Sequence, residues 1–180
     1  MSTKITTGPV RLSYCNVFKP RAFRDGDAEK YSVVLLIPKK DKKTVKKIKD
    51  AINAEIEEGK ESYWKGKMPK DFWNPLRDGD DEPDHPEYAG MYFMNAKSES
   101  KPILLDRDKE ELFDQSEIYS GCWARANIGL YPFDNRAKGI GVWLNALMKY
   151  RDDEPFGNAM TVDSAKKSFD DDDFDEDDDF

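Results

Sequence analysis

Apolar residues recur with two different periods along this chain, and the shorter period predicts β-strands. Runs in which apolar and polar residues alternate, or in which β-branched and aliphatic residues are continuous, are typical of half-buried and fully buried strands. We expect strands over residues 9–17, 30–37, 89–97, 102–106, 118–131 and 140–150. The last two are separated by the turn-like segment PFDNRAKG, so they are expected to form a hairpin.

One segment has a helical period instead. Four apolar residues recur there at spacings of three and four, namely Val45, Ile48, Ile52 and Ile56. This spacing places them on one face of a helix. Asp41 can cap the start of the helix and Gly59 is expected to end it, while lysines occupy the other faces.

The order of these elements predicts the fold. Residues 60–87 are rich in Pro, Gly and Asp, which indicates a long irregular loop. Five or six strands, with one α-helix after the second strand and long loops, predict a mainly β, OB-fold-like small antiparallel barrel, because closure removes exposed strand edges. We assign residues 1–157 to this domain and residues 158–180 to a flexible tether and acidic tail.

The net charge of −8 conceals two regions of opposite character. Residues 170–180, DDDDFDEDDDF, contain nine acids and no base, whereas residues 1–77 contain 18 Lys and Arg against 10 Asp and Glu. The chain therefore combines a body with a basic first half and a strongly anionic tail. The acidic composition predicts that the tail is disordered.

The strand expected at 118–131 carries the first candidate binding surface. Its inward face is predicted to hold Cys122, Ala124, Ala126, Ile128 and Leu130. The opposite face presents Trp123, Arg125, Asn127 and Tyr131, and the partner strand adds Trp143. Aromatic side chains can stack with the bases of single-stranded DNA, and arginine can contact phosphates. Coverage of this face by a loop, the helix or a second copy of the chain is the alternative.

A second candidate surface is the segment FKPRAFR, expected to connect the first two strands. It interleaves aromatic and basic side chains, namely Phe18, Lys19, Arg21, Phe23 and Arg24. This composition suits a groove for single strands, although the two phenylalanines could instead plug the end of the barrel. Basic residues near other strand ends, including Arg11, Arg77 and Lys97, could line the same channel or remain solvated.

Composition argues against several other classes of function. Two cysteines without metal-ligand spacing and one histidine, His85, are too few for a Cys/His zinc site, so Cys15 and Cys122 are expected to be buried thiols.

No nucleophile, P-loop or zinc-protease motif is present, and His85 is expected to be solvated. We predict no enzyme activity and no cofactor or metal. The absence of a signal-like or membrane-spanning stretch predicts a soluble intracellular protein.

The tail has a feature beyond its charge. Phe174 and Phe180 stand among aspartates, with Asp178 and Asp179 directly before Phe180. Such a segment suits capture in an apolar pocket with a basic rim on a partner protein. It could also occupy the basic surface of its own body and compete with DNA. Neither the tail nor residues 78–87 have the spacing of a calcium-binding EF-hand loop.

Several blocks of the sequence resemble one known family. The blocks are VRLSYCNVFKPRAF, KYSVVLLIPK, NPLRDGD, YAGMYFMNAKS, IYSGCWARANIGLYPFDN and KGIGVWLNALMK. In this order and spacing they are similar to a phage-type family of single-stranded DNA-binding proteins, and the resemblance covers about residues 8 to 157. It implies an OB-fold that binds single-stranded DNA without catalysis. The tail is similar in kind to the tails of phage single-strand binders.

These observations together predict a sequence-independent single-stranded DNA-binding protein of phage DNA replication, recombination or repair, acting in the host cytoplasm. The tail is predicted to recruit replication or recombination proteins, and both a monomer and a homodimer are compatible with the sequence. The alternatives are an acidic DNA mimic or interaction protein that does not bind DNA itself, and a metal-dependent nuclease. Binding of DNA by the body, and magnesium-dependent cleavage, would distinguish them.

Overall fold

The computed structural model describes residues 3–22, 26–156, 166 and 168–169. Within them the elements are β1 (Thr3–Thr6), β2 (Val10–Arg21), β3 (Lys30–Pro38), α1 (Lys42–Ser62), β4 (Phe72–Trp73), β5 (Arg77–Asp78), the 3-10 turns η1 (Gly79–Asp81) and η2 (Pro86–Tyr88), β6 (Met91–Ser98), β7 (Ile103–Leu105), β8 (Trp123–Asp134) and β9 (Lys138–Arg151). The predicted boundary between residues 157 and 158 lies outside the described residues.

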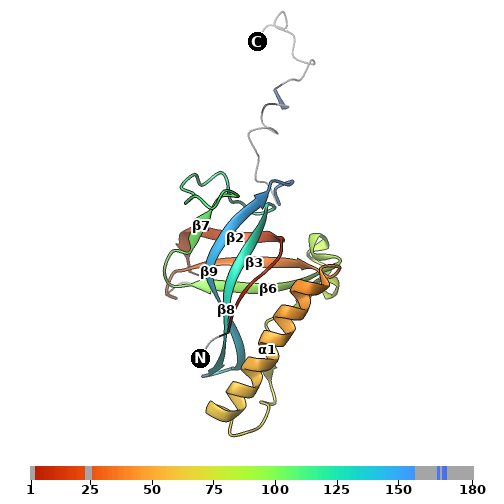
Figure 1. Cartoon of the computed structure of the whole chain (residues 1–180), viewed down its shortest axis with the longest axis vertical. Coiled ribbons are helices and arrows are strands. Elements are labelled where there is room, and N and C mark those ends of the chain that lie inside the picture. Colours follow the sequence, from red (N-terminus) through yellow and green to blue (C-terminus); the bar gives the residue numbers. More distant parts are fainter. Residues whose placement is uncertain (1–2, 23–25, 157–165, 167, 170–180) are drawn as a thin grey trace, which may run out of the picture.

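Five strands pair in a closed ring. The pairings run β8–β2–β3–β6–β9, and β9 returns to β8 as the long hairpin expected from the sequence. In Figure 1, β8 and β9 run almost vertically, β2, β3 and β6 cross them, and α1 lies along one side. The remaining short strands attach to members of this ring.

The sheet is mixed rather than antiparallel throughout, which corrects the prediction. Antiparallel pairs make up most of the ring, but β6 pairs with β9 in parallel through Lys97 and Trp143. The short strands β4 and β7 also run parallel to β9. The mainly β class and a helix of the predicted position are confirmed, although α1 follows the third strand because β1 was not predicted.

The core is formed by the inward faces of the ring and one face of α1. The five residues predicted for the inward face of the strand at 118–131 are all fully buried, four of them on β8 and Cys122 directly before it. On β9 the alternation of buried and outward side chains shifts by one residue. Adjacent residues of β8, Asn127 and Ile128, pair with Ala146 and Leu144, so one residue of β9 is skipped between them. Asn145 is therefore an extra residue, a β-bulge that turns Leu147 into the core in place of Ala146.

Helix α1 begins where predicted. The Asp41 side chain accepts a hydrogen bond from the backbone N–H of Thr44, and the apolar face buries Val45 and Ile48 against the sheet. Its end differs from the prediction, because the helix continues past Gly59 to Ser62. Gly59 is required for packing instead: a Cβ there would lie 2.6 Å from the ring of Trp64.

Two further boundaries differ from the expectation. Strand β2 continues to Arg21, so Phe18 to Arg21 belong to a strand rather than to a connecting loop. Strand β8 begins only at Trp123, after a turn. Both thiols are free. Cys122 is buried as expected, whereas Cys15 is only partly buried against the core, and loss of solvation raises its pKa to about 12.

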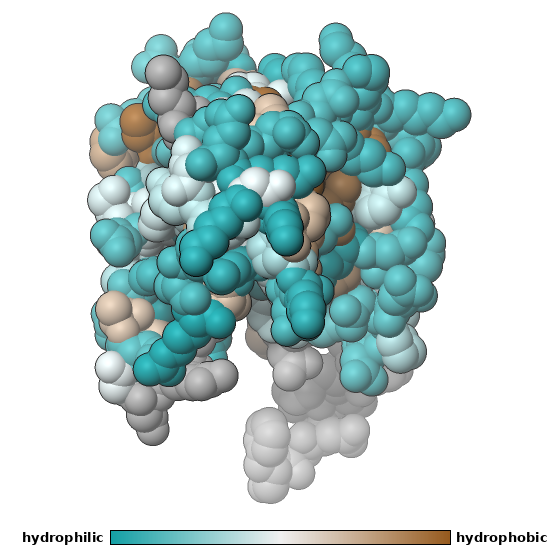
Figure 2. Space-filling view, turned by 90° about the horizontal axis from the view of Figure 1, so that it is seen from below, coloured by the Kyte–Doolittle hydropathy of each residue, from teal (hydrophilic) through white to brown (hydrophobic). Residues whose placement is uncertain are grey.

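Much of the surface is polar, as the charged composition requires. Seen from below relative to Figure 1, the molecule shows a mainly hydrophilic face with small hydrophobic patches between charged side chains (Figure 2). Helix α1 is not long and apolar enough to cross a membrane, nor is any other helix in the described ranges.

Replacing Gly59 with alanine should destabilise the protein. Gly→Ala within a helix normally stabilises it, but here the new methyl group would collide with Trp64, which is 5% exposed and donates a hydrogen bond to the Phe133 carbonyl. We expect a loss of about 1–3 kcal/mol in the free energy of unfolding, measured by urea denaturation. Asn53→Ala, at an exposed position of the same helix, is the control and should not destabilise. Equal stability of G59A and wild type would contradict this packing.

Candidate nucleic-acid interface

A groove crosses the outer face of the ring. It consists of two adjoining cavities that share Ser32, Arg77 and Asn95, and we call the whole the sheet groove. Period-two alternation places its floor opposite the core: Ser32 and Val34 of β3 pair with Lys97 and Asn95 of β6. The same strands that fill the core with one face therefore display the other face in the groove.

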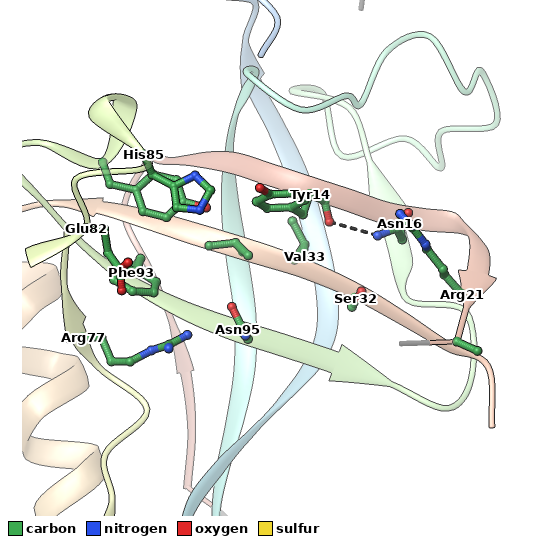
Figure 3. A pocket seen from close by; sticks show the side chains of 13 residues that line it. Tyr14, Asn16, Arg21, Ser32, Val33, Arg77, Glu82, His85, Phe93 and Asn95 are labelled. Carbon is green, nitrogen blue, oxygen red and sulfur yellow. Dashed lines mark hydrogen bonds between the residues drawn. The ribbon is translucent and has the colours of Figure 1, made fainter. Parts of the chain in front are cut away.

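The first cavity, which we call the His85 pocket, has a volume of about 500 Å³. It is lined by Tyr14, Asn16, Arg21, Ala22, Ser32, Val33, Val34, Arg77, Glu82, His85, Tyr88, Phe93 and Asn95. In Figure 3, Arg77, Glu82 and His85 lie at one end of the pocket and Arg21 at the other. The His85 ring stacks on Tyr88 at 4.6 Å and meets Tyr14 edge-on at 5.9 Å, so it is packed rather than freely solvated as expected.

The second cavity, the Trp143 pocket, has a volume of about 530 Å³. Its lining comprises Lys30, Ser32, Trp73, Pro75, Arg77, Asn95, Ala96, Lys97, Tyr131, Phe133, Asn135, Ile140, Gly141, Val142 and Trp143. The rings of Tyr131 and Trp143 are stacked, with centroids 4.9 Å apart and planes inclined by 19°. Trp73 is 45% exposed, so it presents a large aromatic surface to solvent.

Two glycines of β9 make this arrangement sterically feasible. A Cβ on Gly141 would lie 2.3 Å from the Tyr131 ring, so the absence of a side chain allows Tyr131 to lie across the strand beside Trp143. A Cβ on Gly139 would lie 2.4 Å from the Trp73 carbonyl oxygen. Glycine here allows β4, which carries Trp73, to pair closely with β9.

Arg77 lies where the two cavities meet. Its guanidinium is 4.4 Å from the Phe93 ring centroid and 4.9 Å from that of Trp73, and its buried Nε finds no hydrogen-bond partner within the part of the chain that the structure describes. Among the described residues no carboxylate forms an ion pair with it. An arginine held between aromatic rings without an acidic partner is available for an anion or for a stacked base.

Two lysines add positive charge to the Trp143 pocket. Burial, and secondarily the nearby positive charge of Lys30, lower the pKa of Lys97. No carboxylate is found among the residues that line this pocket. Two cations brought together without an acid repel each other, and a bound phosphate would relieve that repulsion.

Tyr14 has an unusual backbone conformation in this groove. Its φ is +45°, and it lies within the register shift of β2 between Ser13 and Asn16. This left-handed conformation is unfavourable for a residue with a bulky side chain. The bulge turns the Tyr14 side chain outward, where it is 56% exposed above the His85 pocket.

The structure brings together five of the residues selected from sequence. Arg21 and Arg77 line the His85 pocket, while Arg77, Lys97, Tyr131 and Trp143 line the Trp143 pocket. Phe18 is partly buried against the core with Lys101 above its ring, and Lys19 is exposed on β2. Neither Phe18 nor Lys19 lines the two cavities.

Three other selected residues lie elsewhere, at the far end of β8. The Trp123 indole donates a hydrogen bond to Asp153 at 2.8 Å, which is the main cause of a lowered pKa for that carboxyl group. Arg125 donates to the carbonyl of Thr7, and Arg11 to those of Gly121 and Glu154. These side chains fasten neighbouring segments, and their contact with DNA stays a prediction.

The remaining selected residues lie outside the described residues. They are Phe23 and Arg24 of the second candidate surface, and Phe174, Asp178, Asp179 and Phe180 of the tail.

Sequence reasoning missed much of the groove. The sequence did not predict binding by the outer faces of β2, β3 and β6, which contribute Tyr14, Asn16, Lys30 and Asn95. It also did not predict Trp73, which comes from the loop after α1. One available signal was the pair Gly139 and Gly141, at alternate positions of a predicted strand. Small residues on the face opposite the core indicate that another part of the chain packs closely there.

Comparison with known proteins identifies relatives over nearly the whole chain. The family described as the single-stranded DNA-binding protein of Enterobacter phage Enc34 matches residues 3–180. A protein designated p50 from Acyrthosiphon pisum secondary endosymbiont phage 1 is 31% identical, covering 85% of this chain and 86% of its own. The resemblance to phage single-stranded DNA-binding proteins is thereby confirmed.

Solved structures give the same result. The single-stranded DNA-binding protein from bacteriophage Enc34, in complex with single-stranded DNA, is 36% identical with a TM-score of 0.71, covering 86% of this chain and 89% of that one. The gp2.5 single-stranded DNA-binding protein of bacteriophage T7 has a TM-score of 0.64 at 18% identity, covering 93% and 94%, and shows the fold alone. The predicted OB-like fold is confirmed.

Replacement of Tyr14 with glycine should give a more stable protein than replacement with alanine. Both variants lose the ring, but only glycine adopts a φ of +45° without strain. We expect Y14G to exceed Y14A by about 1 kcal/mol in the free energy of unfolding, measured by urea denaturation. At Lys19, an exposed residue of the same strand, alanine should be the more stable of the two. The same order at both positions would contradict the strained backbone.

Proposed function

Because the chain belongs to the family of the Enterobacter phage Enc34 single-stranded DNA-binding protein, we propose that it binds single-stranded DNA along the sheet groove. The family is one of binding proteins rather than enzymes, in line with the absence of catalytic motifs from the sequence. The observation that supports the groove most directly is its lining. Aromatic rings line both adjoining cavities, together with cations for which the described residues show no ion pair.

Bases and phosphates would use different parts of this lining. Trp73 and Tyr14 offer exposed ring faces, and a base can stack on either regardless of its identity. Lys30, Lys97 and Arg77 supply positive charge, and no described residue forms an ion pair with any of them, which suits the phosphate backbone. Binding of this kind is largely independent of sequence and weakens as salt concentration rises.

The rival function, an acidic DNA mimic without DNA binding of its own, leaves this groove without a purpose. A protein that only imitates DNA needs negative charge on its surface, whereas the Trp143 pocket is lined by cations and aromatic rings. We therefore place DNA binding in the body of the protein and keep the acidic segment for a separate role.

That separate role is recruitment of other proteins. Residues 170–180 combine nine acids with Phe174 and Phe180, which suits an apolar pocket with a basic rim on a replication or recombination protein. We propose that the protein coats single strands in phage DNA replication, recombination or repair, within the cytoplasm of the host. Coating keeps the strand extended while the acidic segment brings in the partner. A homodimer would offer two such segments.

Removal of the Trp73 ring should weaken DNA binding. Stacking of one base on an aromatic ring contributes about 1–3 kcal/mol, so W73A should bind oligo-dT roughly 5-fold to 100-fold more weakly than wild type. The measurement is fluorescence anisotropy of a labelled oligo-dT at two salt concentrations, with duplex DNA for comparison.

The matched control for W73A is Phe113→Ala. Phe113 is 73% exposed and lies outside both cavities, so its removal deletes an exposed aromatic ring without affecting the groove. Thermal melting should show that both variants are folded. If W73A bound oligo-dT as tightly as F113A does, the groove would not be the binding surface.

Deletion of residues 170–180 should preserve or raise affinity for oligo-dT, because nine negative charges are removed. Any gain should shrink as salt screens the charges. The double variant F174A/F180A keeps every acid, so it should bind DNA like wild type while failing to stimulate the cognate polymerase or recombinase in a strand-synthesis or strand-annealing assay. Weaker DNA binding by the deletion, or full stimulation by the double variant, would count against this role of the tail.

A further inference from the structure

The two halves of the sheet groove differ in chemistry. The Trp143 pocket offers stacked rings and lysines, which serve any nucleotide. The His85 pocket adds polar side chains that can recognise the edge of a base, namely Asn16, Ser32, Asn95 and Glu82, beside the rings of Tyr14, Tyr88 and Phe93. Convergent polar groups in an apolar pocket are typical of a site that fixes the orientation of a specific ligand.

Glu82 is the most informative of these groups. It is the one carboxylate among the described residues that line the groove, and no ion pair of its side chain is found within them. A carboxylate there opposes binding of the phosphate backbone, so it does not serve general affinity. An ionised carboxylate only accepts hydrogen bonds, so the ligand group that suits it is a donor.

The nucleobases differ in this property. Cytosine and adenine carry an exocyclic amino group that donates hydrogen bonds, whereas thymine has a carbonyl oxygen at the corresponding position. A carboxylate accepts from the amino group of cytosine and faces an unfavourable oxygen in thymine. Ser32 and Asn95, which both donate and accept hydrogen bonds, can bind the other polar atoms of the base edge.

We propose that the His85 pocket holds one nucleobase that carries an exocyclic amino group, and that Glu82 accepts a hydrogen bond from that group. This inference rests on the proposed function of the sheet groove. The pocket volume of about 500 Å³ is that of a small-molecule site and accommodates a single base. Binding along the strand is then non-selective except at one position, where cytosine is preferred over thymine.

The strained backbone of Tyr14 supports a specific site here. A left-handed tyrosine persists only where the surrounding structure holds it, and such residues cluster at ligand sites. The Tyr14 ring is held edge-on to His85, above the pocket that contains Glu82. It is therefore placed to cover a base whose edge contacts the polar residues below (Figure 3).

The test compares bases of equal size. Short oligo-dT is prepared with a single thymine replaced by cytosine at each position in turn, and each strand competes with labelled oligo-dT. Wild type should prefer the best-placed cytosine strand by about fivefold to tenfold. Glu82→Gln should lose this preference, because the glutamine amide donates to thymine as readily as it accepts from cytosine.

The matched control is Glu99→Gln, which removes an equal charge near Tyr131, outside both pockets. It should change affinity for all strands alike and keep the preference. A wild type that binds oligo-dT without preference at any position, or an E82Q variant that retains the preference, would overturn the inference while leaving the groove as the binding site. Failure of wild type to bind oligo-dT at all would overturn both.

Discussion

The ring of strands has its fewest paired residues where β6 meets β9, and the sheet groove lies over this junction. Strands β6 and β9 meet in parallel through the single pair Lys97 and Trp143, whereas β8 and β9 pair along almost their whole length. Strands that meet in one register position diverge on both sides of it, so backbone pairing cannot seal the surface there. Side chains and a returning loop occupy the opening, and the side chains of the closing pair themselves line the groove.

The loop after α1 is attached to the ring in two places, and these attachments shape the groove. Strand β4 pairs with β9 over Gly139, and β5 pairs with β6 beside Phe93. The first attachment presents Trp73 and the second presents Arg77, so a ring and a cation from one loop reach the middle of the sheet. The loop that bridges β9 and β6 thus also contributes an aromatic ring and a cation to the sheet groove.

Prediction from sequence succeeded where local pattern determines structure. Helix α1 and the long hairpin follow from periodicity, and the inner face of β8 follows from alternation. Prediction failed where a single residue shifts which side chains of a strand face the core, as at the Asn145 bulge and at Tyr14. It also failed for Trp73, because pairing of a two-residue strand with β9 depends on contacts distant in sequence. Trp123 and Arg125 show that a strand face is not one surface, since each is held by a neighbouring segment far from Tyr131.

Three local costs to the free fold coincide in the groove. Tyr14 has a strained backbone, and the buried Nε of Arg77 has no hydrogen-bond partner among the described residues. Lys97 lies near Lys30, and burial together with that neighbouring charge lowers its pKa. Left-handed Lys65 and Lys109 are exposed instead in turns, where such conformations are ordinary. A single strand of DNA in the groove, as proposed, would supply a base for the Tyr14 ring, an acceptor for the Arg77 guanidinium and a negative charge for the lysines. These three features destabilise the free protein, and they lie on one surface where a single ligand could relieve all of them. Such a combination indicates selection for binding rather than for stability.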